Sequence, residues 1–360
     1  MEFERAILAE YEQKKEIYKD LENYVAGILT DMMKKDNVML MELTHRLKTS
    51  ESLAAKVIKK DKYRVLTDIT DVVGCRLVAY FADDVDQIAA MVSRRFQMDW
   101  GNTVDKSAAL SPTAFGYTSL HYVCSLPEEG EFTDYPAEFR GIRFEIQIRT
   151  ALQHVWAEIE HDLGYKSEFG VPRSIRREFS RIAGLLEIAD ERFNAIRTSV
   201  GDYTLEIRDM IKNDLATDLL VDQVSLKEYM YRNVRMQDLI NQIARECDIC
   251  VEHVDPFPYL KALEYLNIVT LGDLSAVMER NWNAILSYAR ELLTDTDMDL
   301  ISSNAILRFI CYSELICGGY SEKRIVQFMS YASTNKERAR QNAKALLAQK
   351  ELFTGKITNE

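Results

Sequence analysis

The stretch Ile142-Arg-Phe-Glu-Ile-Gln-Ile-Arg149 alternates apolar and polar residues without interruption. Successive side chains of a β-strand point to opposite faces, so this stretch predicts one apolar and one polar face. The apolar face holds Ile142, Phe144, Ile146 and Ile148, and the polar face holds Arg143, Glu145, Gln147 and Arg149. We expect a helix to start at Thr150. The polar row is either a functional surface or the solvent-exposed side of an outer strand, since both give this pattern.

The neighbouring segments predict a mixed α/β domain. Residues 74–81 and 119–126 favour strands, and a helix over about 85–96, capped by Asp83 and Asp84, is expected between them. An amphipathic helix is predicted within residues 1–35. After the alternating stretch, apolar residues recur at helical spacing and predict a core-facing side of a helix: Leu152, Val155, Trp156, Ile159 and Leu163. Helices and strands therefore interleave up to about residue 166.

From about residue 174 onward, every periodic segment predicts helix. We place a domain boundary near residue 200, which gives an α/β domain over 1–200 and an all-helical domain over 201–360. Residues 259–274 predict a helix, a tight turn and a second, capped helix. Such hairpins occur in nucleic-acid-binding and protein-docking modules, but two helices that merely pack together give the same pattern. The sequence leaves open whether the second domain is regulatory, oligomerising or otherwise.

The composition excludes several classes of protein. An apolar content of 47% over 360 residues is typical of a globular protein. The net charge of −12 argues against general affinity for nucleic acid or anionic membranes, although a concentrated basic site remains compatible with it. The N-terminus lacks the features of a secretory signal, no apolar run approaches about 18 residues, and the six cysteines fit reduced thiols. We therefore predict a cytoplasmic protein that is not inserted in a membrane.

Two residue clusters raise the question of a structural or catalytic metal. His154, Glu158 and His161 share one side of a predicted helix, but they lack the His-Glu-x-x-His spacing of a zinc protease. Cys247-x-x-Cys250-x-x-His253 resembles half a zinc knuckle, although the same spacing fits buried packing on a helix. Whether Cys247, Cys250 and His253 bind a metal is left open.

Three short segments before the alternating stretch carry residues suited to nucleotide chemistry. Arg46, Lys48 and Lys56 lie around the start of a predicted helix, and cations beside helical amide groups suit a polyphosphate. Asp71 lies just before a strand, where a carboxylate can hold Mg²⁺ rigidly. Tyr117 follows a glycine in a loop and could stack on a nucleobase. Each has an ordinary alternative, namely a solvated surface, a cap or core packing.

The order of these segments is more specific than any one of them. HRLKTSESLAAK (45–56), DVVGCR (71–76), FGYTSLHYV (115–123) and EIQIRTALQHVWAEIEHDLGYK (145–166) together resemble the synthetase domain of RelA/SpoT-type alarmone synthetases, particularly the small single-function members. The resemblance covers about residues 40–170. It implies a nucleotidyltransferase-like mixed sheet flanked by helices. It also implies an Mg²⁺-dependent pyrophosphokinase that transfers pyrophosphate from ATP to the ribose 3′-hydroxyl of GDP or GTP, which makes (p)ppGpp and AMP.

The resemblance assigns roles position by position. The family's ATP-binding residues correspond to Arg46, Lys48, Lys56 and Arg76. The two arginines would sandwich adenine, and the two lysines would hold the phosphates. The catalytic carboxylates around Mg²⁺ correspond to Asp71 and Glu145, and Glu145 is our candidate for the base. On the acceptor side, the correspondence gives Tyr117, which would stack on guanine, with His121, Gln147 and Arg149.

The segment around Tyr117 departs from the family pattern. Many alarmone synthetases carry extra basic residues in the loop before this tyrosine and an arginine after it, whereas here the loop has few cations and Thr118 follows. The acceptor is therefore less certain than ATP. Toxic relatives that pyrophosphorylate tRNA 3′ ends or adenosine nucleotides are an alternative, and a catalytically silent nucleotide-binding regulator is another. Small relatives are often homo-oligomers, but no pattern here fixes a subunit number.

A basic stretch after the resemblance bears on the tRNA alternative. Its members are Arg173, Arg176, Arg177 and Arg181. They could contact RNA, but a solvated helix face is the more common origin of such a stretch.

Overall fold

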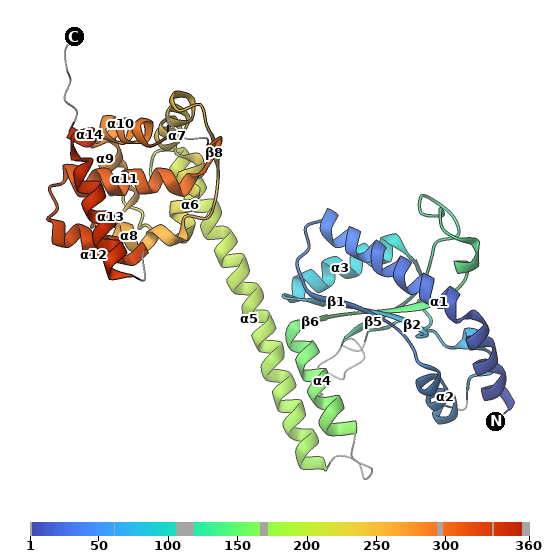
Figure 1. The fold of residues 1–360 in the computed structure, drawn as a ribbon. Coiled ribbons are helices and arrows are strands. Elements are labelled where there is room, and N and C mark those ends of the chain that lie inside the picture. The colour runs from blue at the N-terminus through green and yellow to red at the C-terminus, as the bar shows by residue number, and fades with distance from the viewer. Residues whose placement is uncertain are drawn as a thin grey trace. The chain divides into compact units, whose positions relative to one another are not determined.

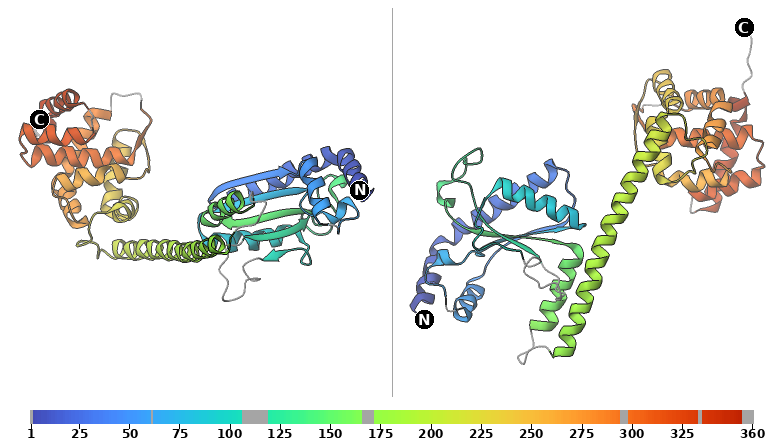
Figure 2. Two further views of the ribbon diagram at one scale, coloured as in Figure 1. Left: turned by 90° about the horizontal axis from the view of Figure 1, so that it is seen from below. Right: turned by 180° about the vertical axis from the view of Figure 1, so that it is seen from behind.

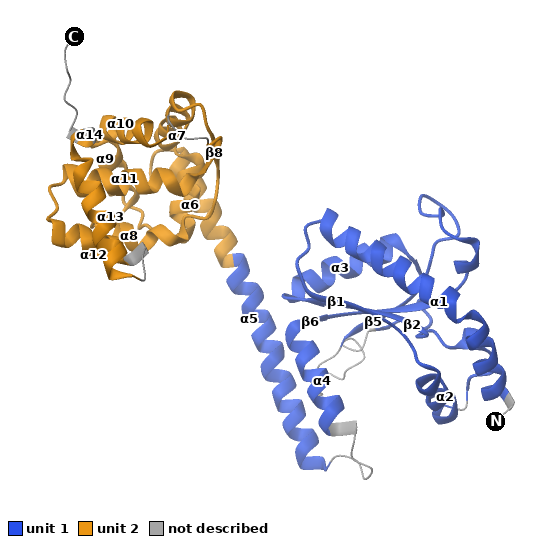
Figure 3. Ribbon diagram, in the orientation of Figure 1, with its two compact units in different colours: residues 1–198 blue, residues 199–360 orange. Residues whose placement is uncertain are grey.

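The computed structural model describes residues 2–60, 62–105, 119–165, 172–293, 298–332 and 335–354. The chain forms two compact units, residues 1–198 and 199–360 (Figure 3). Helix α5 (Arg173–Lys212) contributes residues to both. The units are described separately below.

The first unit is built on a six-stranded mixed sheet with the order β1-β2-β6-β5-β3, in which β4 also pairs with β5 (Figure 1). The strands are β1 (Leu40–Leu47), β2 (Val73–Ala79), β3 (Gln97–Met98), β4 (Val104–Asp105), β5 (Leu120–Ser125) and β6 (Phe144–Thr150). β2 and β6 are parallel, and the other pairs are antiparallel. The predicted mixed α/β architecture is confirmed.

The helices of this unit lie on both sides of the sheet. They are α1 (Glu2–Lys35), α2 (Ser50–Lys59), α3 (Ala82–Arg95) and α4 (Ala151–Tyr165), with short 3₁₀ turns η1 (Leu66–Asp68) and η2 (Ala137–Phe139). α1 and α3 cover one face (Figure 1 and Figure 2). There they bury the apolar side chains of β6, because Phe144, Ile146 and Ile148 belong to the same core as Leu21 and Ile88. The predicted alternation is therefore confirmed: Glu145 and Gln147 lie on the opposite face.

Helix α4 differs from its prediction in both its start and its packing. It begins at Ala151, because Thr150 caps it: the Gln153 amide donates to Thr150 Oγ1 at 3.1 Å. Of the residues expected in the core, only Trp156 is buried, and its ring packs edge-on against Phe179 of α5. Val155, Ile159 and Leu163 are 49%, 48% and 65% exposed, so the prediction that they are core residues is wrong. Helical spacing shows which side chains share a side of a helix, but not whether another element covers that side.

The first turn of α3 also corrects a prediction. Asp83 and Asp84 lie inside the helix and do not cap it, since the capping position is Phe81. Their carboxylates face α5: Asp84 Oδ1 accepts from Arg197 at 2.6 Å, and Asp83 Oδ1 accepts from Asn194 at 3.0 Å. They also lie in the first turn of α3, where the helix dipole favours negative charge. The two aspartates therefore attach α5 to the first unit.

The second unit is a helical bundle around one apolar core. Its helices after α5 are α6 (Gln223–Arg232), α7 (Val234–Glu246), α8 (Leu260–Tyr265), α9 (Leu271–Arg280), α10 (Trp282–Leu293), α11 (Ser303–Cys317), α12 (Glu322–Ala332), α13 (Lys336–Ala348) and α14 (Lys350–Thr354), with the 3₁₀ turn η3 (Phe257–Tyr259). Helix α11 is the most buried, and Phe309, Ile310 and Cys311 are inaccessible to solvent. Two three-residue strands, β7 (Cys250–Glu252) and β8 (Leu300–Ser302), pair in parallel. The all-helical prediction is therefore wrong in this detail.

The hairpin predicted at 259–274 is formed by α8 and α9, and Thr270 caps α9. Its turn packs against the segment before α6. The amides of Leu271 and Gly272 donate to the carbonyl oxygens of Leu219 and Thr217 at 2.8 and 2.9 Å. The backbone donors that a nucleic-acid-binding hairpin would offer to phosphate at this turn are thus already used. Within the described residues, no helix has the length and apolar character of a membrane span.

The close approach at this turn gives a prediction for stability. A Cβ at Gly272 would lie 2.6 Å from the Thr217 carbonyl oxygen, and backbone cannot move aside easily. We expect Gly272→Ala to destabilise the second unit by about 2 kcal/mol or more. Gly201→Ala is the matched control, because Gly201 is helical with free space around its Cα, and it should stabilise by up to about 1 kcal/mol. Guanidinium unfolding of the full chain, followed by circular dichroism, compares the two. Equal midpoints would contradict the packing described here.

Candidate active site

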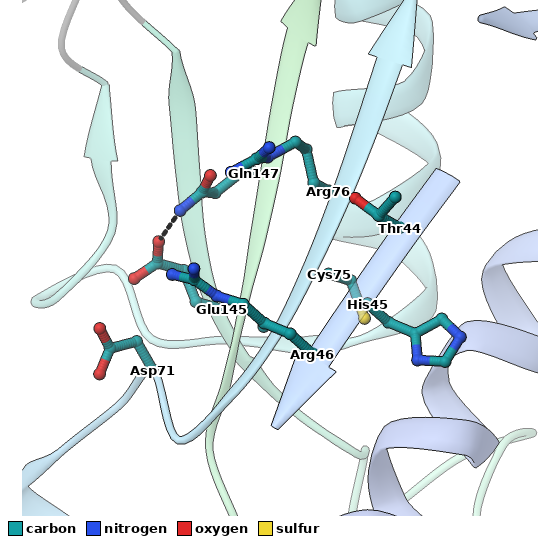
Figure 4. A pocket seen from close by; sticks show the side chains of 9 residues that line it. Thr44, His45, Arg46, Asp71, Cys75, Arg76, Glu145 and Gln147 are labelled. Carbon is teal, nitrogen blue, oxygen red and sulfur yellow. Dashed lines mark hydrogen bonds between the residues drawn. The ribbon is translucent and has the colours of Figure 1, made fainter. Parts of the chain in front are cut away.

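A pocket of about 170 Å³ lies on the polar face of the sheet (Figure 4). Its lining residues come from β1, from β2 with the residues before it, and from β6: Thr44, His45, Arg46, Asp71, Gly74, Cys75, Arg76, Glu145 and Gln147. Strand register explains why these residues meet. Thr44 pairs with Arg76, and Arg76 with Gln147, so the three side chains share one face. The His45 side chain points away, toward Glu22 of α1 (Figure 4).

Asp71 is held by two lysines. Its carboxylate lies 2.7 Å from Lys56 Nζ and 3.0 Å from Lys48 Nζ. Lys48 follows β1 and Lys56 lies in α2, whose N-cap is Thr49. Burial alone would raise the pKa of Asp71, but the two ammonium groups outweigh it and keep this pKa below its ordinary value. Asp71 is therefore ionised at neutral pH, and the lysines are held beside it.

Glu145 is held by hydrogen bonds from His121 and Gln147. Its Oε1 accepts from Gln147 Nε2 at 2.7 Å and lies 2.7 Å from His121 Nδ1. Ser119 Oγ lies 2.6 Å from the other imidazole nitrogen, which fits a His121 that donates from Nδ1 and accepts at Nε2. Burial raises the pKa of Glu145, but the hydrogen bonds from His121 and Gln147 leave it lowered overall. Glu145 is thus also ionised at neutral pH.

The two carboxylates converge on the same space. Both line the pocket, and Figure 4 shows them projecting into it from neighbouring segments. The negative charge of Asp71 raises the pKa of Glu145, so the two groups interact electrostatically. Two ionised carboxylates and adjacent space are a suitable donor set for a hard divalent cation that takes its other ligands from phosphate and water. The chemistry of these residues fits such an ion.

Other proposed metal ligands do not assemble. Among the described residues, no group of three or more His, Cys, Asp or Glu side chains is arranged to hold a metal. The expected helix at Cys247, Cys250 and His253 is absent: Cys247 follows α7, Cys250 begins β7, and His253 stacks on Tyr231 with ring centroids 4.3 Å apart. On α4, His154 and Glu158 face arginines.

Three arginines extend the polar face beyond the carboxylates. Arg46, Arg76 and Arg149 lie on the neighbouring strands β1, β2 and β6. Arg149 is only 4% exposed, and burial, with Arg76 as a second cause, lowers its pKa to about 10. Burial and then Arg149 lower the pKa of His154, so this imidazole is neutral at neutral pH. The strand register places Arg46 level with Glu145, across Gly74, whereas Arg76 and Arg149 lie farther along β2 and β6 from Asp71 and its two lysines.

The structure brings together most residues that the sequence singled out. Arg46, Arg76, Asp71, Glu145 and Gln147 line the pocket, and Lys48, Lys56 and His121 contact its carboxylates. Arg149 lies beside the pocket among the arginines. Tyr117 and Thr118 lie outside the described residues. Glu158 was considered only as part of a metal face with His154 and His161, and its pairing with Arg76 was not predicted, because spacing does not show how α4 lies against the strands.

Comparisons with known proteins find similarity over part of the chain. Residues 45–169 match the family model described as a region found in RelA / SpoT proteins. The chain is 27% identical over 184 residues to the GTP pyrophosphokinase YjbM of Bacillus subtilis (strain 168). This match spans 51% of this chain and 84% of that protein. It is 26% identical over 159 residues to the GTP pyrophosphokinase YwaC of the same organism, with 43% and 72% covered.

Two solved structures are similar to about half of the chain. The crystal structure of small alarmone synthetase 1 from Bacillus subtilis is 23% identical, covers 54% of this chain and 99% of that chain, and gives a TM-score of 0.45. Small alarmone synthetase 2 from Bacillus subtilis is 22% identical, with 52% and 98% covered and a TM-score of 0.44.

The ion pairs of Asp71 predict an unusual effect on anion binding. Asp71→Asn removes a charge that now engages both lysines, so Lys48 and Lys56 become free to bind phosphate. Without divalent cations, we expect inorganic tripolyphosphate to bind this variant several-fold more tightly than it binds the wild-type protein, as measured by calorimetry. Asp68→Asn is the control, because Asp68 accepts from the backbone amides of Arg64 and Val65. Weaker binding by Asp71→Asn would show that the lysines do not serve an anion site.

The lowered pKa values of Asp71 and Glu145 predict a pH dependence of stability. A carboxyl group with a lowered folded pKa stabilises the protein above its ordinary pKa of about 4, and this contribution is lost as the pH falls through the folded value. The free energy of unfolding should therefore fall from about pH 5 toward pH 3, and less steeply in Asp71→Asn. Urea unfolding over this range measures both slopes. Identical slopes would contradict the lowered pKa of Asp71.

Proposed function

We propose that the chain is a RelA/SpoT-type synthetase, since residues 45–169 match the model of that region, and that it acts as an ATP:GDP/GTP pyrophosphokinase that makes (p)ppGpp and AMP. The observation that carries the proposal is a pocket lined by ionised Asp71 and Glu145 and by Arg46 and Arg76, with Lys48 and Lys56 paired to Asp71 beside it. This combination suits a polyphosphate, a divalent cation and a purine, and Mg²⁺ is the ion we propose.

The lysines and arginines bind the donor ATP. Phosphate oxygens compete with Asp71 for the ammonium groups of Lys48 and Lys56, so the triphosphate enters where the lysines already point. Arg46 and Arg76 project from adjacent strands into the same pocket and would enclose the adenine ring. As the β,γ-pyrophosphate moves, the bond from the β-phosphorus to the oxygen bridging to the α-phosphorus breaks, and AMP leaves with that oxygen.

Asp71 and Glu145 would hold Mg²⁺, which when bound neutralises charge on the transferred phosphates. The 3′-oxygen of the acceptor forms the new bond to the β-phosphorus, and its proton must be accepted. Glu145 is the proposed acceptor of this proton. Its lowered pKa makes it a weak base, but in a loose phosphoryl-transfer transition state the hydroxyl loses its proton late, so orientation and a weak base suffice.

The acceptor side rests on residues around Glu145. His121 and Gln147 fix the Glu145 carboxylate by hydrogen bonds, and so they orient the group that meets the ribose hydroxyl. Arg149 supplies charge at the far end of β6. Tyr117 is proposed to stack on guanine on the strength of the sequence resemblance.

A transfer assay tests the proposed reaction. Purified protein is incubated with Mg²⁺ and ATP labelled at the γ-phosphate, together with GDP, GTP, unlabelled ATP or tRNA, and the products are resolved. We expect label on guanine nucleotides and release of AMP. Label on tRNA or on an adenine nucleotide would instead establish the alternative acceptors. Label on no acceptor would overturn the proposed activity and favour a silent regulator.

A variant tests the role of Glu145 in this reaction. Glu145→Gln removes the negative charge and keeps the shape, so turnover should fall by about 100-fold or more while ATP remains bound. Glu138→Gln changes an exposed carboxylate in η2 and serves as the control with unchanged turnover. Near wild-type turnover of Glu145→Gln with retained ATP binding would exclude Glu145 as the proton acceptor.

A further inference from the structure

Glu158 does not line the pocket, yet its carboxylate lies against two arginines of the polar face. Arg76 Nη1 donates to Glu158 Oε1 at 3.1 Å, and Arg149 Nη2 lies 3.8 Å from the same oxygen. The side chains of Arg76 and Glu158 are 27% and 54% exposed. Glu158 comes from α4, whereas the arginines come from the strands.

The arginines repel one another, and Glu158 counteracts this. Arg76 and Arg46 both contribute to the lowered pKa of Arg149, whereas Glu158 and Glu42 raise it. His154, which lies 3.7 Å from the same Glu158 oxygen, is neutral at neutral pH and adds no positive charge to the cluster. Without the Glu158 carboxylate, the guanidinium group of Arg76 would be free to swing away from Arg149.

The start of α4 fixes the position of Glu158. Thr150 caps the helix, and its hydroxyl is hydrogen-bonded at 2.7 Å to the buried carboxylate of Asp190 on α5. Glu158 follows about two turns later on the same helix. Its backbone position is therefore determined by the junction between β6 and α4.

Overall stability does not account for this contact. An ion pair that is partly exposed to water contributes about 0–1 kcal/mol, so the fold has little need of it. The contact instead fixes the orientation of Arg76, because an arginine held by a carboxylate keeps its planar guanidinium in one orientation. A guanidinium whose charge is already paired is suited to the face of an uncharged ring, while Lys48 and Lys56 remain the groups suited to phosphate.

We propose that Glu158 is a positioning residue for the base of the donor nucleotide, which it serves by holding Arg76 in the orientation that stacks on the ring. This inference rests on the proposed function for the purine nucleoside triphosphate in the pocket and for the stacking of Arg76 on its base. Glu158 does not line the pocket, and in this proposal it acts through Arg76. Glu158 therefore affects binding of the base, whereas Lys48 and Lys56 bind the phosphates.

The test uses one ligand that carries a base and one that consists of phosphates alone. Binding of the α,β-methylene analogue of ATP and of inorganic tripolyphosphate is measured by calorimetry with the full chain carrying Glu158→Ala. We expect the analogue to bind about five- to tenfold more weakly and tripolyphosphate to bind within about twofold of the wild-type affinity. Glu178→Ala, which removes the exposed partner of Arg181 on α5, is the matched control and should change neither affinity.

A second variant shows whether the effect passes through Arg76. In a protein that already carries Arg76→Ala, adding Glu158→Ala should weaken analogue binding no further. Equal losses for the analogue and tripolyphosphate, unchanged binding of both, or additive losses in the double variant would each overturn the inference. Thermal unfolding of each variant by circular dichroism excludes loss of the fold as the cause of a change.

The outcomes also separate this inference from the proposed reaction. If the wild-type protein binds the analogue in a Glu158-dependent way but transfers no pyrophosphate, the proposed function fails and the role of Glu158 stands. If transfer occurs but Glu158→Ala binds the analogue as the wild-type protein does, the role of Glu158 fails alone. If the wild-type protein does not bind the analogue, both are overturned.

Discussion

The parallel pairing of β2 with β6 is the constraint on which the site depends. It sets Gly74 opposite Glu145 and Arg76 opposite Gln147, and so it brings Asp71 and Glu145, distant in the chain, to one pocket. β1 adds Arg46 at the edge of the same face. On the opposite face, α1 and α3 bury the apolar side chains of these strands, so the sheet is held by its core on one side and is free to carry charge on the other.

Local patterns predicted the sheet better than they predicted packing. The alternation from Ile142 to Arg149 identifies the buried and polar faces of β6, because side-chain direction in a strand follows from the backbone alone. Helical spacing could not show that Ile159 and Leu163 are left exposed, because that depends on which elements cover α4. The pairing of β7 with β8 was missed because three residues are too few for an alternating pattern to be visible.

The site was predicted as a set of residue types, but not as a set of interactions. The segments carrying Lys48, Lys56 and Asp71 were singled out separately, and only the fold shows that the two lysines neutralise this one carboxylate. Residue spacing places Gln147 beside Glu145 on one strand face, but the contact of His121 with Glu145 follows from the pairing of β5 with β6, which spacing does not reveal. The contact of Glu158 with Arg76 depends on how α4 is oriented against the sheet, and it has no signal in the sequence.

Asp71 and Glu145 together are proposed to bind one divalent cation beside a polyphosphate. Electron paramagnetic resonance of Mn²⁺, titrated into the protein with the α,β-methylene analogue of ATP, measures this directly. We expect one tightly bound Mn²⁺ whose affinity falls by at least about tenfold in Asp71→Asn and in Glu145→Gln alike, because each variant removes one of two ligands. Full Mn²⁺ affinity in either variant would contradict it.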